Sequence, residues 1–207
     1  EVSESEEFGR FVGYYLAEGH VSVRHKSGRA AAVVFTFGSK EEDFINDVVS
    51  LSEKLFGITP LVNLNKNDNS AKISINNVFV AELMLDLCGT GYGKKYLTQE
   101  AESAPLDYIK GVLIGAARGD GCCYSGGVML DFVNPELIHQ LKLLATRIGL
   151  TPDSRYYANQ KGNLTGTLRF SGTTPNNEDF IFSVAKNLQN YNGVSPYGVN
   201  RGANYAL

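Results

Sequence analysis

The chain has 207 residues, of which 43% are hydrophobic and 20% charged, with 22 Gly and 6 Pro. This composition excludes a disordered, collagen-like or low-complexity chain, and the length suffices for one large domain or two small ones. With 19 Lys and Arg against 22 Asp and Glu, the formal net charge is −3. The overall charge therefore gives no sign of a polyanionic partner, and a nucleic-acid interface must be argued from where the charges lie.

The cysteines and the apolar runs indicate a compartment. Cys88 and the adjacent Cys122 and Cys123 form no CxxC pair, so neither a disulfide framework nor a cysteine zinc site is encoded. No apolar run reaches the roughly 18 residues of a membrane span, and the acidic start of the chain is unlike a signal peptide. We expect an intracellular, reducing location, in the cytoplasm or nucleoid, and no membrane partner.

Residues 8–19 and 109–121 read alike. Glu18 of the first stretch matches Asp120 of the second, 102 residues further on. In both stretches the apolar residues recur at i, i+3, i+4, i+7 and i+8, which predicts a helix with one buried stripe. Each predicted helix ends in a carboxylate that is followed by a glycine.

The likeness continues downstream of both stretches. Residues 34–37 and 128–132 read as strands that lead directly into amphipathic helices. Ser39 with Glu42 predicts a capping box at the start of the first of these helices. The Asn134–Pro135 pair predicts the start of the second, because Asn caps a helix and Pro suits its first position.

The second part of each half also follows one pattern. Both amphipathic helices stop at a glycine, Gly57 or Gly149. Two strands and a closing helix then follow in each half, predicted at 61–64, 71–75 and from Asn76–Asn77, and at 154–157, 164–170 and from Asn176–Asn177.

Each half is therefore an α-β-β-α-β-β-α repeat of the α+β class. Its helices cover one face of a four-stranded antiparallel sheet and leave the other face open as a platform for a partner. We expect a first repeat over residues 1–105, a second over 106–192 and a tail over 193–207.

The doubled segment resembles the signature of the LAGLIDADG homing endonuclease family, whose nine-residue motif matches residues 11–19 and 113–121. The resemblance implies a monomer with internal pseudo-twofold symmetry, whose two sheets form a DNA-binding saddle. It further implies hydrolysis of both strands of a long asymmetric duplex site with Mg²⁺. The motif style is typical of the endonuclease module of an intein, and a free-standing intron-encoded enzyme is equally compatible.

The glycines of the repeated helices agree with this resemblance. They recur at i and i+4 in both helices and would let the two backbones approach closely, at Gly9, Gly13, Gly111 and Gly115. Such packing would bring Glu18 and Asp120 side by side at one end of the helix pair. Two neighbouring carboxylates repel each other unless a divalent cation lies between them, and hard oxygen ligands suit Mg²⁺ or Mn²⁺.

We expect Glu18 and Asp120 to be catalytic metal ligands. The resemblance adds Gly19 and Gly121, the glycines that follow them, to the metal-binding set, and it implies that Ca²⁺ supports binding without cleavage. The alternative is that both acids are ordinary residues of a last helical turn. The helix dipole disfavours negative charge there, and its occurrence in both repeats favours the metal.

A lysine close to the acids would stabilise charge on a phosphate. Residues 93–97 resemble the lysine-bearing segment of intein endonucleases, with Lys95 as the first candidate and Lys94 as the second. The alternative is a plain solvated pair of lysines. Residues 190–193 carry no lysine at the equivalent place in the second half, which puts a symmetric second lysine in doubt.

The DNA contacts are expected on the strands. Acids crowd the chain ends and the helices, for example Glu41, and we expect the fold to turn them away from the open sheet faces. Basic residues instead occupy strands and loops, where they would follow a DNA groove. The candidate DNA contacts are Arg24, Lys26, Arg29, Asn63, Asn65, Lys66, Lys72, Arg155, Tyr157, Asn159, Gln160, Lys161 and Arg169. Any one of them can equally be a solvated strand residue.

Three further residues follow the motifs. His20 is interpreted as a surface histidine, with an approach to DNA or metal as the alternative. Cys122 and Cys123 are expected to open a strand.

The sequence thus predicts a Mg²⁺-dependent, site-specific DNA endonuclease. A rival of another class is a DNA-binding regulator or an RNA maturase without nuclease activity on the same scaffold. A third alternative is an interaction module that never touches DNA, which would make the basic strands a coincidence.

Overall fold

The computed structural model describes residues 2–24, 28–65, 67–124, 127–158, 162–177, 179–181 and 183–184. The elements of the first half are α1 (Glu6–Glu18), β1 (Gly19–Val23), β2 (Ala30–Gly38), α2 (Glu42–Phe56), β3 (Leu61–Asn65), β4 (Ser70–Ile75) and α3 (Val78–Cys88). A short helix, α4 (Gln99–Ser103), joins the halves. The second half has α5 (Leu106–Asp120), β5 (Gly121–Tyr124), β6 (Gly127–Phe132), α6 (Pro135–Arg147), β7 (Asp153–Ala158), β8 (Leu164–Ser171) and a 3₁₀ turn (Pro175–Asn177).

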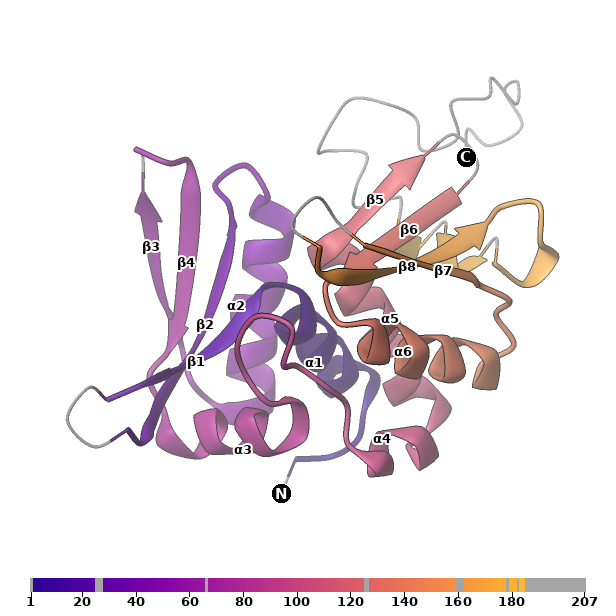
Figure 1. Cartoon of the computed structure of the whole chain (residues 1–207). Coiled ribbons are helices and arrows are strands. Elements are labelled where there is room, and N and C mark those ends of the chain that lie inside the picture. Colours follow the sequence, from indigo (N-terminus) through magenta and orange to yellow (C-terminus); the bar gives the residue numbers. More distant parts are fainter. Residues whose placement is uncertain are drawn as a thin grey trace, which may run out of the picture.

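Two antiparallel four-stranded sheets lie on either side of the central helices α1 and α5 (Figure 1). Their strand orders, β1-β2-β4-β3 and β5-β6-β8-β7, are equivalent. Gly19 pairs with Phe35 in the first sheet, as Gly121 pairs with Leu130 in the second. The register therefore repeats with the sequence, and the predicted α+β architecture of two repeats is confirmed. The second closing helix and the tail predicted at 193–207 fall largely or wholly outside the described residues.

Glycines hold α1 and α5 together. A Cβ atom on Gly13 would lie 2.2 Å from the carbonyl oxygen of Val112, and one on Gly115 would lie 2.2 Å from that of Arg10. No side chain fits at these positions, because real Cβ atoms do not approach backbone oxygens so closely. The predicted glycine contact between the two helices is confirmed.

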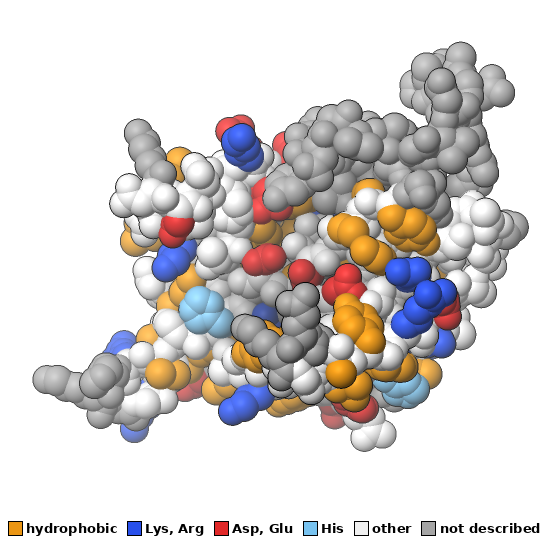
Figure 2. All heavy atoms as spheres, turned by 45° about the horizontal axis from the view of Figure 1, so that its top comes forward, with side chains coloured by type: hydrophobic (Ala, Val, Ile, Leu, Met, Phe, Trp, Pro, Cys, Tyr) orange, Lys and Arg blue, Asp and Glu red, His pale blue; other side chains and the backbone are white. Residues whose placement is uncertain are grey.

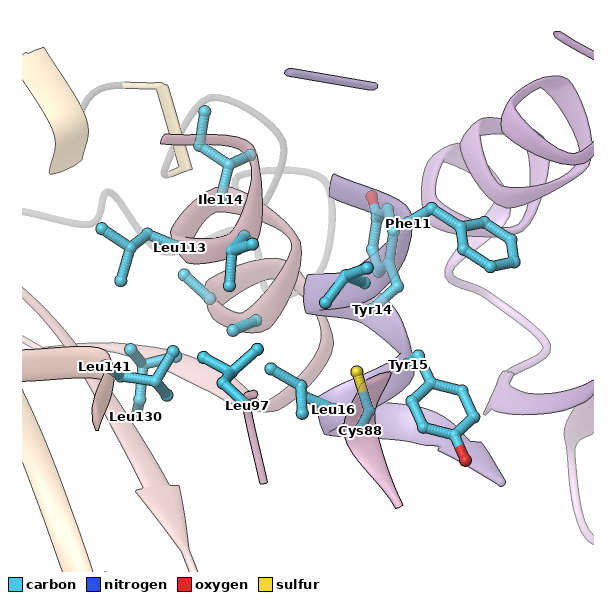
Figure 3. Packing of buried hydrophobic residues seen from close by; sticks show 14 of the residues in the cluster. Phe11, Tyr14, Tyr15, Leu16, Cys88, Leu97, Leu113, Ile114, Leu130 and Leu141 are labelled. Carbon is cyan, nitrogen blue, oxygen red and sulfur yellow. The ribbon is translucent and has the colours of Figure 1, made fainter. Parts of the chain in front are cut away.

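Each central helix also covers its own sheet. Phe11 and Tyr15 of α1 point away from Leu113 of α5 (Figure 3). Phe11 packs edge to face on Phe35 of β2, with ring centroids 5.3 Å apart. The core therefore runs from one sheet through the helix pair to the other.

The helix starts are confirmed in two places and wrong in one. Asn77 caps α3 and Asn134 caps α6 through their side-chain oxygens. The capping box at Ser39 and Glu42 does not form, because the backbone N–H of Ser39 donates to Asn69 and α2 begins only at Glu42. The carboxylate of Glu41 instead accepts a hydrogen bond from the N–H of Gly38 at 2.6 Å.

A charged cluster ties α2 to both central helices. The carboxylate of Asp47 lies 2.9 Å from Nε of Arg10 and 3.0 Å from Nη1 of Arg118, and it accepts a hydrogen bond from the Tyr14 hydroxyl at 2.9 Å. These charged side chains are mostly buried, so the cluster fixes the first half against α5. Within the described residues, no helix has the length and apolarity needed to cross a membrane.

Candidate active site and nucleic-acid interface

The C-terminal ends of α1 and α5 meet between the sheets. A Cβ atom on Gly119 would lie 2.4 Å from Cβ of Ala17 and 3.4 Å from Cγ of Glu18. Glu18 therefore borders the residue that precedes Asp120. Both helices end at their acid, and the chain continues directly into β1 at Gly19 and β5 at Gly121. The structure thus brings the two sequence-predicted acids together.

The environment of both acids disfavours their charged forms. Partial burial, followed by repulsion from Asp120, raises the pKa of Glu18 to about 7. Asp120 is exposed, yet desolvation by the surrounding protein and repulsion from Asp131 raise its pKa to about 6. Carboxylates with pKa values raised in this way are often found in functional sites.

Lys95 is the cation next to these acids. Its ammonium donates to the carbonyl oxygens of Tyr15 and Leu16 at 2.8 and 2.9 Å, and more weakly to that of Ala17 at 3.4 Å. Partial burial lowers its pKa to about 8, against the opposing effect of Glu18. Lys95 therefore satisfies the last carbonyls of α1 and holds the turn from which Glu18 projects. Lys94 is exposed.

A pocket of about 370 Å³ opens beside the helix ends. It is lined by the start of β1, a glycine-rich loop, the end of α5 and the β6–α6 junction, with Gly19, His20, Gly91, Tyr92, Gly93, Lys95, Asp120, Asp131 and Asn134 among its residues. His20 is exposed, and partial burial of its ring, with Lys95 and Lys72 nearby, lowers its pKa. The lowered pKa favours the neutral imidazole.

Two further acids lie near the predicted pair. Glu41 raises the pKa of Glu18 and Asp131 raises that of Asp120. The carboxylate of Glu41 folds back onto Gly38 at the end of β2 and lies close enough to Glu18 to affect its pKa. That Glu41 faces away from the open sheet faces stays a prediction. Asp131 is the one charged residue of the apolar strand β6. A charged residue within an apolar strand is the sequence signal that could have identified Asp131 as part of the site.

The donor set suits a hard divalent cation. Glu18 and Asp120 offer carboxylate oxygens, and a cation between them would offset the repulsion that raises their pKa values. Among the described residues, no three His, Cys, Asp or Glu side chains converge on one metal position. Water and substrate phosphate oxygens are the further ligands that Mg²⁺ usually takes.

The open face of the first sheet is mostly uncharged. Lys72 of β4, the sole Lys or Arg within β1–β4, pairs with Asn63 of β3, and both side chains are exposed. Asn65 uses its side chain in the β3–β4 turn, where it donates to Asp68. Arg24 and Arg29 are exposed near the tip of the β1–β2 hairpin.

The candidates on the second sheet are engaged with neighbouring side chains. Arg155 lies 3.4 Å from the carboxylate of Asp153, and Tyr157 donates its hydroxyl to Asp131 at 3.3 Å. The guanidinium of Arg169 lies 5.9 Å from the ring centre of Tyr124. Lys26, Lys66, Asn159, Gln160 and Lys161 lie outside the described residues. As expected, Cys122 and Cys123 open a strand, β5.

On the face drawn in Figure 2, acidic side chains gather near the middle and basic ones lie mainly towards the edges. A phosphate backbone at the centre would meet net negative charge unless a cation is bound. Among the described residues, the basic side chains on this face therefore lie mainly at its periphery.

Residues 5–96 match the family model of the LAGLIDADG-like domain. The match covers the first repeat, so the first half of the chain is similar to a LAGLIDADG-like domain, and the second half repeats its strand order.

Curated relatives are longer than this chain. It is 26% identical over 226 residues to the "Uncharacterized protein MJ1054" of Methanocaldococcus jannaschii, covering 97% of this chain and 24% of that protein. It is also 26% identical over 115 residues to the iron-sulfur cluster assembly SufBD family protein Rv1461 of Mycobacterium tuberculosis, covering 56% of this chain and 13% of that protein. The chain thus spans a quarter or less of these relatives.

Solved structures share the fold. The crystal structure of I-DmoI in complex with DNA and Mn matches with a TM-score of 0.66 and 12% identity, over 88% of this chain and 97% of that chain. The N-terminal LAGLIDADG domain of DUF199/WhiA matches with a TM-score of 0.58 and 13% identity, over 88% of this chain and 83% of that chain. At such identities the likeness shows the fold alone.

Proposed function

We propose that this protein is a metal-dependent DNA endonuclease that acts as a monomer on a long asymmetric duplex site. The observation that carries the proposal is the pair Glu18 and Asp120, set side by side at the ends of two glycine-packed helices. I-DmoI, a homing endonuclease of the same fold, has been crystallised with DNA and Mn. That likeness supports a divalent metal and a duplex DNA partner here.

In this proposal Glu18 and Asp120 hold the cation, with Gly19 and Gly121 as neighbouring backbone ligands. When bound, Mg²⁺ or Mn²⁺ lowers the pKa of its water and stabilises the leaving oxygen of the phosphodiester. Lys95 fixes the last turn of α1 and adds positive charge on the phosphate side of the acids. Lys94 remains the second candidate for that charge.

The two open sheet faces would lie in the major groove on either side of the cut. Antiparallel strands fit that groove, and the candidate contacts on the strands are Asn63 and Lys72 of the first sheet and Arg155 and Arg169 of the second. Their polar atoms are suited to read base edges, while Arg24 and Arg29 reach outward to phosphates.

Selection from a randomised duplex library tests the proposal. The purified protein is incubated with Mg²⁺, with Ca²⁺ or without metal, and bound and cut molecules are sequenced. We expect cleavage at one site of about twenty base pairs with Mg²⁺ and binding alone with Ca²⁺. No selected site in any arm would contradict both DNA binding and cleavage.

One observation favours a second candidate, a regulator or RNA maturase that binds nucleic acid without cutting it. The Lys95 ammonium donates to the carbonyls of α1. Glu41 and Asp131 add negative charge near Glu18 and Asp120. Selection of one bound sequence with no cut product under Mg²⁺ or Mn²⁺ would favour this candidate.

A further inference from the structure

The loop between α3 and α4 crosses over α1 and reaches the pocket (Figure 1). It contains three glycines with positive φ, Gly89 at 63°, Gly91 at 96° and Gly93 at 66°. Glycine adopts such angles without strain, so the chain can turn sharply three times within five residues.

The loop is fixed at its base. The carbonyl of Gly89 accepts a hydrogen bond from the Tyr15 hydroxyl at 2.6 Å, and the Thr90 hydroxyl accepts one from the N–H of Val21 at 3.0 Å. On the returning side, Tyr96 donates its N–H to Cys88. Together with the Lys95 ammonium, these contacts anchor the loop to α1 and β1.

The crest of this anchored loop carries an aromatic ring and a cation. Tyr92 is 71% exposed and also lines the pocket that holds Asp120 and Asp131. Lys94 is exposed two residues further on. We call Tyr92 and Lys94 the loop crest.

The position of the loop crest fixes which part of a duplex it would meet. If each open sheet occupies a major groove, the segment between the two contacts turns its minor groove towards the helix ends, since the grooves alternate around the duplex. The pocket lies at those ends. Aromatic and apolar side chains that meet a minor groove commonly wedge against base steps, and exposed lysines pair with its phosphates.

We propose that the loop crest is a minor-groove contact at the centre of the DNA site, in which Tyr92 wedges against the central base steps and Lys94 pairs with a flanking phosphate. This proposal rests on the DNA binding proposed above, but not on cleavage. It gives Lys94 a role in binding, consistent with its position outside the pocket lining.

Fluorescence and salt dependence test the two residues separately. The probe is the duplex selected from the library, with 2-aminopurine at a central step and Ca²⁺ in place of Mg²⁺. We expect binding to unstack the probe and raise its fluorescence. Tyr92→Ala should abolish this rise while Tyr92→Phe retains it, because the ring and not the hydroxyl wedges.

The expected effect of Lys94→Met is on the salt dependence of affinity. One lost phosphate contact lowers the slope of log affinity against log salt by about 0.9 for B-DNA, without changing the selected sequence. Two control variants should change neither readout. Lys110→Met removes an exposed lysine near Glu6, at the far end of the central helices, and Tyr156→Ala removes an exposed ring of β7.

The outcomes separate this inference from the proposed function. Unchanged fluorescence in Tyr92→Ala, or an unchanged slope in Lys94→Met, overturns the corresponding contact even if the parent protein cuts DNA. If the parent binds DNA without cutting it, and neither variant changes its readout, the protein is a DNA-binding regulator and the loop crest makes no DNA contact. A parent that binds no duplex overturns the inference and the DNA proposal together.

Discussion

The two halves of the molecule repeat each other in backbone and differ around their acids. In the first half, Lys95 satisfies the carbonyls at the end of α1, and Glu41 is the neighbouring acid of Glu18. In the second half, Asp131 of β6 neighbours Asp120 and accepts hydrogen bonds from Thr167 and Tyr157.

This difference separates what symmetry fixes from what it leaves free. Thr36 occupies the strand position in the first half that Asp131 occupies in the second, because both follow the residue paired with the motif glycine. Close packing of α1 and α5 allows only glycine at equivalent positions of the two helices, whereas the strand faces have no such steric restriction. We therefore expect the two strands of a duplex to meet unequal sites.

The largest effect should come from the part that the halves share. In the Gly13→Ala variant, the higher helix propensity of alanine would stabilise α1 by about 1 kcal/mol. The added Cβ atom, however, would overlap the carbonyl oxygen of Val112. We expect a net loss of roughly 3 kcal/mol, lowering Tm by about 10 °C, and the same for Gly115→Ala. Thermal unfolding followed by circular dichroism measures this.

Asn46→Ala is the matched control, since Asn46 is exposed on α2 and its replacement should stabilise slightly. Equal stability of Gly13→Ala and the parent would show that the helices do not meet at these glycines.

The pH dependence of stability is the next largest effect. The pKa of Glu18 is raised from 4.5 to about 7 and that of Asp120 from 3.8 to about 6, so the folded protein binds more protons than the unfolded chain between these values. The stabilisation is complete below pH 4 and is lost as pH rises through 6 to 7. Tm without metal should therefore fall over this range, more through Glu18 than through Asp120.

Differential scanning calorimetry in EDTA from pH 5 to 7.5 checks this. Mg²⁺ should restore Tm at pH 7, and Glu18→Gln should flatten the profile more than Asp120→Asn. Identical, flat profiles for the parent and both variants would contradict the crowding of the two acids.

A smaller, one-sided effect is expected at Asp131. Asp131→Asn keeps the oxygen that accepts from Thr167 and Tyr157 but removes the charge beside Asp120. We expect about tenfold more Mn²⁺ to be needed for cutting one strand, with the other strand unaffected. End-labelling each strand separately measures this.

Asp153→Asn serves as the control for Asp131, because Asp153 lies on the same sheet, 64% exposed and paired with Arg155. An equal effect on both strands would mean that Asp131 serves the site as a whole.

The smallest expected effect is a difference between the two sheets in the salt dependence of DNA binding. Lys72→Ala should lower the salt slope of DNA binding by about 0.9, whereas Arg155→Ala should lower it less, since Asp153 already offsets its charge. Affinities measured by anisotropy between 50 and 200 mM salt test the order. The reverse order would mean that the second sheet dominates phosphate contact.

Sequence alone predicted the elements that repeat. Gly13 and Gly115, the caps Asn77 and Asn134, and the acids at both helix ends follow from local rules and from self-similarity, and all of these lie where expected. The roles of the acids remain predictions.

Residue type and position along a strand do not show which side chains already contact a neighbouring residue in the fold. Residue type favours Arg155, Tyr157 and Asn65 as DNA contacts, yet each contacts an acid brought close by strand pairing or by a turn. The approach of Glu41 to Glu18 depends on how the chain leaves β2. Tertiary geometry decides these points.

The most direct test of the central claim compares Glu18→Gln and Asp120→Asn with the parent on the selected duplex. Binding is measured with Ca²⁺ and single-turnover cleavage of each strand with Mg²⁺. The account predicts that both variants bind as tightly as the parent and lose cleavage by at least about a hundredfold. Cleavage of both strands at the parental rate by either variant would contradict it.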